Sequence, residues 1–283
     1  MRAAVDGRRL FFDVDGAKLV PDGPSMREKP TLLVLHGGPG FDHSMMKPWF
    51  APLADVAQVV YLDHVGNGRS DRPPAPELTL DRWGDDVRAF CDALEIEAPV
   101  VFGVSFGGFV AQAYATRHPE HPRGLVLCNT AARHRDDTTL AAFERLGGGE
   151  ARAAAAAFFD RPSSETLIEY ARVCTPVYNR RPQDPDVLTR SLAVANFDLM
   201  IDFFAGEFRR FDFRAALSRV RCPTLVVIGE DDPITPPADG DEMAACLPPA
   251  LARVERFAGC GHPVYQDEEA GFATALRSFL SSL

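Results

Sequence analysis

One serine stands in a setting that is typical of a nucleophile in acyl transfer. The apolar run 100–103 leads into Ser105, which lies in the pattern Gly-x-Ser-x-Gly, and a helix-like segment, 109–118, follows. A serine on a tight turn between strand and helix needs small neighbours, because its backbone is strained and the helix passes close by. The helix dipole at such a turn favours developing negative charge. We therefore predict that Ser105 is the nucleophile; the alternative is a plain glycine-rich turn.

A serine nucleophile needs a general base and an acid that orients the base, in the chain order serine, acid, histidine. The strand-like run 253–257 leads to Gly-Cys-Gly-His, so His262 is the predicted base, which takes the serine proton and gives it to the leaving group. The run 224–228 leads to Gly-Glu-Asp-Asp-Pro. We prefer Asp232 over Asp231 as the acid, because a position just before a proline suits a turn that faces inward.

The oxyanion of acyl transfer requires two preorganised N–H donors. One is expected from Phe106, directly after the serine. The other is expected from Gly38, with Gly37 as second choice, in the sequence His-Gly-Gly-Pro-Gly that follows the apolar run 31–35. The residues predicted to bind substrate are Gly37, His43 and Phe197.

The remaining histidines and the cysteine beside the base are expected to have lesser roles. His36 is expected to be structural, and His64 to lie near the pocket. The histidines expected at the surface are His118, His121 and His134. Cys260 lacks a nucleophile turn, so we expect a buried or pocket-wall thiol. The scattered His and Asp residues lack the spacing of metal ligands, so neither a metal nor a cofactor is predicted.

Short apolar runs, separated by helix-like segments, position these residues. The runs are Thr31–Leu35, Val59–Leu62, Val100–Gly103, Gly124–Leu127 and Thr224–Ile228. Runs rich in β-branched residues, without polar alternation, are typical of strands buried on both faces of a mostly parallel sheet. Helical spacing over 79–94 and 268–283 completes an α/β fold with helices on both faces. Before Thr31 we expect a hairpin, with Asp-Gly turns at 15–16 and 22–23.

One interval, 131–213, contains no convincing buried strand. It has an alanine-rich stretch, several prolines and an aromatic-rich helical segment, 196–208. We predict a helical cap over a core domain made of residues 1–130 and 214–283; the alternative is an elaborated crossover connection. The cap phenylalanines suggest a pocket for an apolar acyl or prolyl-like group, although they could also pack the cap onto the core.

The composition is that of a globular protein. The chain has 283 residues, 46% of them hydrophobic and 25% charged, which is enough for one sizeable core. A net charge of −10 disfavours nucleic acid or an anionic membrane as partner. The N-terminal residues lack the apolar run of a signal peptide, so we expect a cytoplasmic protein with a small-molecule or short-peptide substrate. The oligomeric state is left open.

Four segments resemble, in order, the landmarks of the α/β-hydrolase superfamily over nearly the full chain: HGGPG, GVSFGG, GEDDPITPP and GCGH. HGGPG followed by VVYLDHVGNGRS is similar to the proline iminopeptidase branch of serine peptidases and its hydrolase relatives. The resemblance implies that oxyanion loop, nucleophile, acid and base lie at Gly38, Ser105, Asp232 and His262.

The sequence also departs from that branch. Asp63-His64-Val65-Gly66 stands where the branch has Asp-Gln-Arg-Gly, and Phe106 replaces Trp or Tyr. The Trp-rich, Glu-bearing cap segment that binds a free amino terminus is not found. The carboxylates that could replace it, or simply be solvated helix residues, are Asp198, Asp202 and Glu207.

We expect a serine hydrolase of esters or amides, similar to proline iminopeptidases. A small-ester or lactone hydrolase without peptidase activity is the alternative. A ligand receptor with vestigial hydrolysis, and a lyase or perhydrolase that uses the same triad, are further candidates. Dehalogenase and epoxide-hydrolase chemistry would need a carboxylate in place of Ser105.

Overall fold

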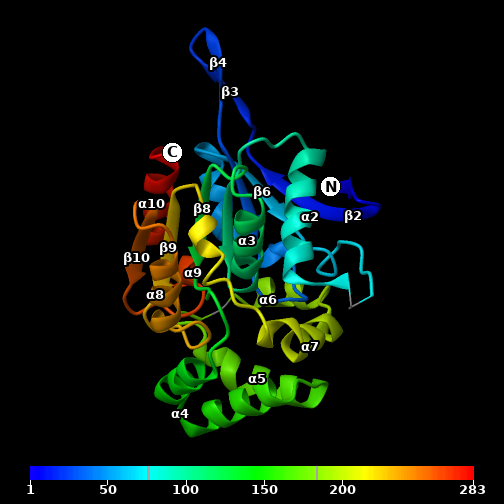
Figure 1. Cartoon of the computed structure of the whole chain (residues 1–283), viewed down its shortest axis with the longest axis vertical. Helices are drawn as coiled ribbons and strands as arrows, with labels where there is room; N and C mark the ends of the chain where they lie inside the picture. Colours follow the sequence, from blue (N-terminus) through cyan, green and yellow to red (C-terminus); the bar gives the residue numbers. More distant parts are fainter. Residues whose placement is uncertain (75–76, 183) are drawn as a thin grey trace.

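The computed structural model describes residues 1–74, 77–182 and 184–283, and a sheet of eight strands forms its centre (Figure 1). Across the sheet the strands follow the order β1 (Arg2–Val5), β2 (Arg8–Asp15), β6 (Gln58–Leu62), β5 (Thr31–Leu35), β7 (Val100–Val104), β8 (Gly124–Cys128), β9 (Thr224–Gly229) and β10 (Ala252–Phe257). Neighbours from β6 to β10 pair in parallel, whereas β1 and β2 are antiparallel. The predicted mostly parallel sheet is confirmed.

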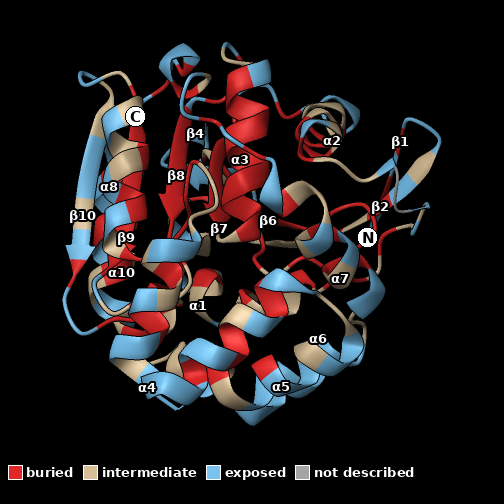
Figure 2. Cartoon of the chain, turned by 60° about the horizontal axis from the view of Figure 1, so that its bottom comes forward, coloured by how far each residue is buried: buried red, intermediate tan, exposed pale blue. Residues whose placement is uncertain are grey.

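Helices cover both faces of this sheet, as predicted. The helices on one face are α2 (Leu80–Ala93), α3 (Phe106–Arg117) and α8 (Pro237–Cys246), and those on the other are α1 (Lys47–Phe50), α9 (Val264–Asp267) and α10 (Glu269–Ser281). Successive strand side chains point to opposite faces. Leu33 and Leu35 therefore join the core under α2 and α3, while Leu32 and Val34 join the core under α1 and α10. The central strands are buried throughout (Figure 2).

Residues 131–213, the cap segment, lie at one end of the sheet (Figures 1 and 2). Its helices are α4 (Asp136–Asp160), α5 (Ser164–Cys174), α6 (Pro185–Leu192) and α7 (Phe197–Ala205), and the 3-10 turns η4 (Thr175–Val177) and η5 (Glu207–Arg209) lie between and after them. Near its two ends, an isolated bridge pairs Arg133 with Asp212. Its division from the core as a separate domain stays a prediction.

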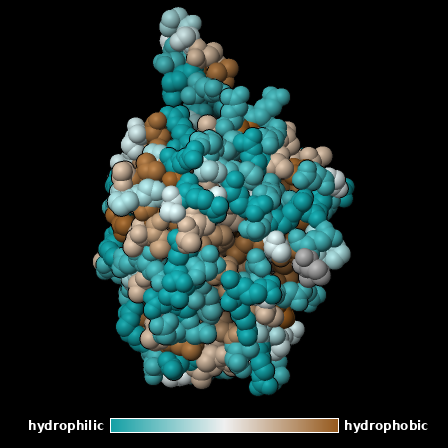
Figure 3. All heavy atoms as spheres, viewed as in Figure 1, coloured by the Kyte–Doolittle hydropathy of each residue, from teal (hydrophilic) through white to brown (hydrophobic). Residues whose placement is uncertain are grey.

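Two hairpins precede the parallel strands. The predicted Asp22-Gly23 turn joins β3 (Leu19–Asp22) to β4 (Ser25–Glu28), and this hairpin projects from the end of the molecule opposite α4 and α5 (Figures 1 and 3). The other hairpin, β1–β2, was not predicted. Its turn is Asp6-Gly7, where both residues have positive φ, 48° and 78°, as a two-residue hairpin turn of this kind requires.

The surface is mostly hydrophilic on the face seen in Figure 3. Within the described ranges, none of the helices combines the length and apolarity needed to cross a membrane. The expected surface position of His121 is wrong: the residue is buried, one ring nitrogen bonds the Tyr114 hydroxyl, and the other lies 3.1 Å from the Ile96 carbonyl oxygen. A polar pair satisfied inside the core leaves no trace in the hydropathy pattern.

Candidate active site

Ser105 alone makes the turn from β7 to α3. Its φ of 53° and ψ of −121° lie outside the regions that residues with a side chain favour, which costs about 1–3 kcal/mol. The flanking glycines are required by close packing. A Cβ atom on Gly103 would collide with the Gly107 carbonyl, and one on Gly107 would collide with the carbonyl of Leu35. The two glycines of the Gly-x-Ser-x-Gly pattern are therefore needed because α3 packs closely against β5 and β7.

The two predicted oxyanion donors lie on either side of Ser105. Phe106 is the first residue of α3, so its N–H has no acceptor within the helix. On the other side, the glycine loop after β5 meets Ser105 at Gly37, where an added Cβ would lie 3.2 Å from the Ser105 Cβ. Gly38 follows with a φ of 62°. The assignment of Gly38 and Phe106 as donors stays a prediction that this placement favours.

The predicted acid and base form a hydrogen-bonded pair. Asp232 follows β9, His262 follows β10, and the His262 Nδ1 lies 2.8 Å from Asp232 Oδ2. A carboxylate only accepts hydrogen bonds, so the Nδ1 nitrogen carries the proton and Nε2 is left as an acceptor. In the described part of the chain, no hydrogen bond joins His262 to Ser105. His262 is therefore oriented as a general base requires, but it does not form a hydrogen bond with Ser105.

The Asp232 carboxylate is fully buried and fully bonded. Oδ1 accepts from the N–H groups of Ile234 at 2.7 Å and Thr235 at 3.2 Å, and Oδ2 accepts from the Thr235 hydroxyl at 2.8 Å. By contrast, the Asp231 side chain is 28% exposed and forms an ion pair with Arg145. The structure thus brings Asp232, and not Asp231, to His262.

Asn129, which is not among the predicted site residues, links all three candidate catalytic residues. Its Nδ2 group donates to Asp232 Oδ2 at 2.9 Å and to the Gly261 carbonyl at 2.8 Å, next to His262. Its own carbonyl accepts from the Ser105 N–H at 3.1 Å. The available signal was a polar residue directly after β8, at the same edge of the sheet as Ser105.

A narrow cavity of about 30 Å³ adjoins Ser105, and cap-segment side chains form much of its wall. The lining is largely aromatic and includes Phe106, Phe109, Phe203, Phe204, Phe208 and Phe211. Asp239 also lines the cavity, as a buried carboxylate that accepts from the Thr138 hydroxyl at 2.9 Å. Burial raises the pKa of Asp239 to about 7.

Two residues predicted to bind substrate are not brought to this cavity. Phe197 is 43% exposed and packs edge-on against Phe41, because it is the first residue of α7 and points outward. His43 is buried elsewhere, with its Nδ1 2.6 Å from Asp63 Oδ1. The third, Gly37, does lie at the nucleophile.

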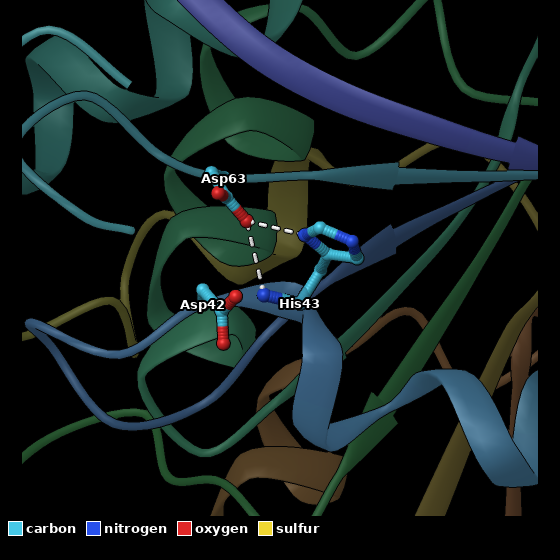
Figure 4. A group of neighbouring side chains, drawn as sticks. All are labelled: Asp42, His43 and Asp63. Atoms are coloured by element: carbon cyan, nitrogen blue, oxygen red, sulfur yellow. Dashed lines mark hydrogen bonds and ion pairs between the residues drawn. The ribbon is translucent and has the colours of Figure 1, made fainter. Parts of the chain in front are cut away.

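Asp42, His43 and Asp63 form a compact buried group whose ligand atoms lie within 4.8 Å of one another (Figure 4). Such a group could in principle hold a cation. However, Asp63 Oδ1 already accepts from the His43 backbone at 3.0 Å, and the Arg69 guanidinium pairs with Asp42. Ser191 also donates to Asp42, at 3.2 Å. The positive charge that these carboxylates need is thus supplied by arginine, and the group holds together the loops behind β5 and β6.

His36 and His64 lie behind the glycine loop as a buried ring pair, 4.6 Å apart. Burial lowers the pKa of both, so both are neutral at pH 7. His64 packs against the Phe106 ring at 5.4 Å, and it is absent from the cavity lining. Its contribution is therefore to support the residue after the nucleophile.

Cys260 is buried beside the base loop. Burial raises the pKa of its thiol to about 11, so the reactive thiolate is absent at neutral pH. Cys260 is therefore a structural thiol, as expected.

Comparison with known proteins gives a consistent result. A family described as the alpha/beta hydrolase fold matches residues 30–269. The chain is 27% identical to the proline iminopeptidase PfmaB of Pestalotiopsis fici, covering 95% of this chain and 98% of the relative. It is 29% identical to the 2-hydroxymuconate semialdehyde hydrolase of a Pseudomonas strain, over 88% of this chain and 86% of the relative.

A solved structure extends this likeness to the whole fold. The proline iminopeptidase of Mycobacterium smegmatis superposes with a TM-score of 0.79 at 24% identity, covering 100% of this chain and 97% of that one. The predicted resemblance to hydrolases of this branch is confirmed.

Proposed function

The chain belongs to the alpha/beta hydrolase fold family, and on that premise we propose that it is a serine hydrolase that cleaves an ester or amide bond through an acyl-enzyme on Ser105. Its substrate is a small molecule or a short peptide, as in proline iminopeptidases. The observation that carries the proposal is the Asp232–His262 pair, held at the same edge of the sheet as a strained serine turn.

Acylation begins when Ser105 Oγ attacks the carbonyl carbon of the substrate. His262 Nε2 accepts the hydroxyl proton, and Asp232 stabilises the resulting imidazolium through Nδ1–H. The N–H groups of Phe106 and Gly38 hold the oxyanion of the tetrahedral intermediate. His262 then donates its proton to the departing alcohol or amine as the bond to the leaving group breaks.

Deacylation repeats these steps with water. His262 accepts a proton from a water molecule that attacks the acyl carbon, and a second tetrahedral intermediate forms. The proton returns to Ser105 Oγ as the carbon–oxygen bond breaks, which releases the acid. The enzyme ends in its starting protonation state, and every step uses groups of this chain and water alone.

The cavity favours an acyl group that is largely apolar. Phenylalanine and other apolar side chains form much of the wall, which suits an aliphatic or prolyl-like acyl part. Asp239 is the observation that favours an amino-acyl substrate, because a buried carboxylate can bind an ammonium group. A small-ester or lactone hydrolase remains the second candidate, favoured by the apolar remainder of the cavity.

The test of the proposal is a substrate panel with wild type and Ser105→Ala. We expect the wild type to hydrolyse p-nitrophenyl esters and to react with a fluorophosphonate probe at residue 105. Ser105→Ala should lose both, with a fall in kcat of about 10⁴-fold or more. Full turnover by the variant would refute the nucleophile.

Proline naphthylamide, run in parallel with the ester series, separates the two candidate functions. Hydrolysis of the amide that Asp239→Asn selectively weakens, with ester turnover unchanged, supports the aminopeptidase. Ester turnover without amide turnover supports the esterase or lactonase.

A further inference from the structure

The loop that carries the base is bound on two sides, by the sheet and by the cap segment. On the sheet side, Asn129 holds the Gly261 carbonyl. On the cap side, the His262 backbone N–H donates to the Tyr178 carbonyl at 2.7 Å, and the Tyr178 ring packs edge-on against the His262 ring at 5.6 Å. The position of His262 therefore depends on the position of the residues just after η4.

Asp267 joins the same two segments. Its carboxylate is buried, with 4% of the residue exposed, and accepts from backbone N–H groups alone. Oδ2 accepts from Gly261 at 2.8 Å, in the base loop. Oδ1 accepts from Arg180 at 3.0 Å and from Arg181 at 2.9 Å, in the cap segment. One side chain thus ties the backbone of the base loop to the backbone of the cap segment.

The joint is closely packed as well as hydrogen-bonded. The Cα of Gly261 lies so near the Tyr178 carbonyl that a Cβ atom there would overlap the oxygen. Glycine at this position is therefore required for the contact, whereas its φ is not left-handed. Any larger residue at position 261 would push the base loop and the cap segment apart.

The wall of the Ser105 cavity gives this joint a functional meaning. The cavity is narrow, about 30 Å³, and much of its wall belongs to the cap segment. A displacement of the cap segment that reaches Tyr178 would be passed on to His262.

We propose that Asp267 is a positioning residue for His262, which places the base against Ser105 only when residues 178–181 of the cap segment are seated on the base loop. The inference rests on the proposed function, in which His262 is the general base. It adds that the placement of the base requires the cap segment to be seated, and that the Asp267 carboxylate joins the two.

Asp267→Asn tests this role, because an amide nitrogen cannot accept the N–H groups that one carboxylate oxygen now holds. We expect kcat on p-nitrophenyl esters to fall about 10- to 100-fold, the size of effect that a misplacement of about 1 Å produces. KM should change far less. The rate of Ser105 labelling by a small fluorophosphonate should fall by a similar factor, because that reaction also needs the base.

Gly261→Ala is the second variant. It should push the base loop and the cap segment apart while Asp267 itself is unchanged. It should reproduce the loss of kcat and of labelling rate. Arg72→Gln is the control: the Arg72 guanidinium donates to the Val194 carbonyl at 2.7 Å, a contact between core and cap segment that does not involve the base loop. It should keep the wild-type kcat.

The outcomes separate the possible roles, with unfolding curves recorded for every variant. A lower stability with unchanged kcat and labelling would make Asp267 merely structural, and a change in KM alone would confine its effect to the cap segment. An equal loss in Arg72→Gln would also overturn the proposal. If Asp267→Asn does not fold, Gly261→Ala decides. A wild type that the probe does not label at Ser105 would instead refute the proposed function itself.

Discussion

Among the described residues, two fully buried aspartates each pair with a histidine at nearly the same distance. The distance from Nδ1 to the carboxylate is 2.6 Å for His43 and Asp63, and 2.8 Å for His262 and Asp232. Both aspartates are fully buried and follow parallel strands of the same sheet. Only the second pair is a candidate for chemistry.

The surroundings of the imidazole account for the difference. His43 packs against the rings of Phe11 and Tyr61, with centroids 5.7 Å and 5.9 Å away, and the cavity beside Ser105 is lined by other residues. His262 shares the Asn129 anchor with Ser105 and faces the cap segment. An oriented imidazole becomes a base only where a nucleophile and space for a substrate adjoin it.

The largest difference between the two pairs is expected when each histidine is replaced. His262→Ala should lower kcat/KM on p-nitrophenyl esters by about 10⁴- to 10⁶-fold, because the serine loses its base. His43→Ala should keep kcat in the folded fraction and lower the free energy of unfolding instead. Steady-state kinetics with urea unfolding curves measure both. A fully folded His43→Ala that is equally inactive would contradict the distinction.

The carboxylates give the next largest effect. Asp232→Asn should lower kcat by about 10⁴-fold, because the amide no longer fixes the tautomer of His262. Asp231→Asn, one residue away and paired with Arg145, should change kcat by less than about twofold, as expected for a surface ion pair. The reverse ranking in the same ester assay would overturn the choice of acid.

A smaller effect is expected from Asn129. Asn129→Ala removes the donor to Asp232 and to the Gly261 carbonyl, so the acid and the base loop both lose an anchor. We expect kcat to fall about 10- to 100-fold with little change in KM. A variant with wild-type kcat at full folding would show that the remaining contacts of Asp232 suffice.

The contribution of the Asp63–His43 pair to the free energy of unfolding should depend on pH in the acid range. Burial raises the pKa of Asp63, but the hydrogen bond and charge of His43 outweigh it, so the pKa is lowered. A lowered folded pKa stabilises the fold above the unfolded value of about 3.9, and this stabilisation is lost as pH falls through the folded pKa.

Asp63→Asn should therefore lower the free energy of unfolding by about 3 kcal/mol at pH 7. Below about pH 4 the stability of the variant should depend less on pH than that of the wild type. Urea unfolding between pH 3 and 7 measures it. An unchanged acid limb would show that Asp63 does not govern this dependence.

The sequence predicted most of what positions the site. The apolar runs locate the strands to within about a residue of their bounds, because strands buried on both faces must be continuously apolar. Ser105 and Asp232 each follow such a run, and His262 follows the strand-like run 253–257, so their common edge could be inferred. The predicted helical spacing over 79–94 corresponds to α2, and the hydroxyl of Thr79 at its N-cap accepts from the Arg82 N–H.

The supporting residues could not be predicted in this way. Asn129 and Asp267 act through backbone groups that are distant in the chain, and no periodicity or spacing marks such partners. His43 and Phe197 were assigned to the substrate because they lie near the expected edge or in the cap, but side-chain direction depends on packing that a sequence pattern does not contain.

The projecting ribbon of β3 and β4 offers a point of attachment. Most of its side chains are exposed, and it stands at the end of the molecule opposite α4 and α5 (Figure 1). Exposed loop tips of this kind accept spliced residues readily. A reporter peptide inserted between Asp22 and Ser25 would tether the protein to a solid support with its cap segment facing the bulk solution.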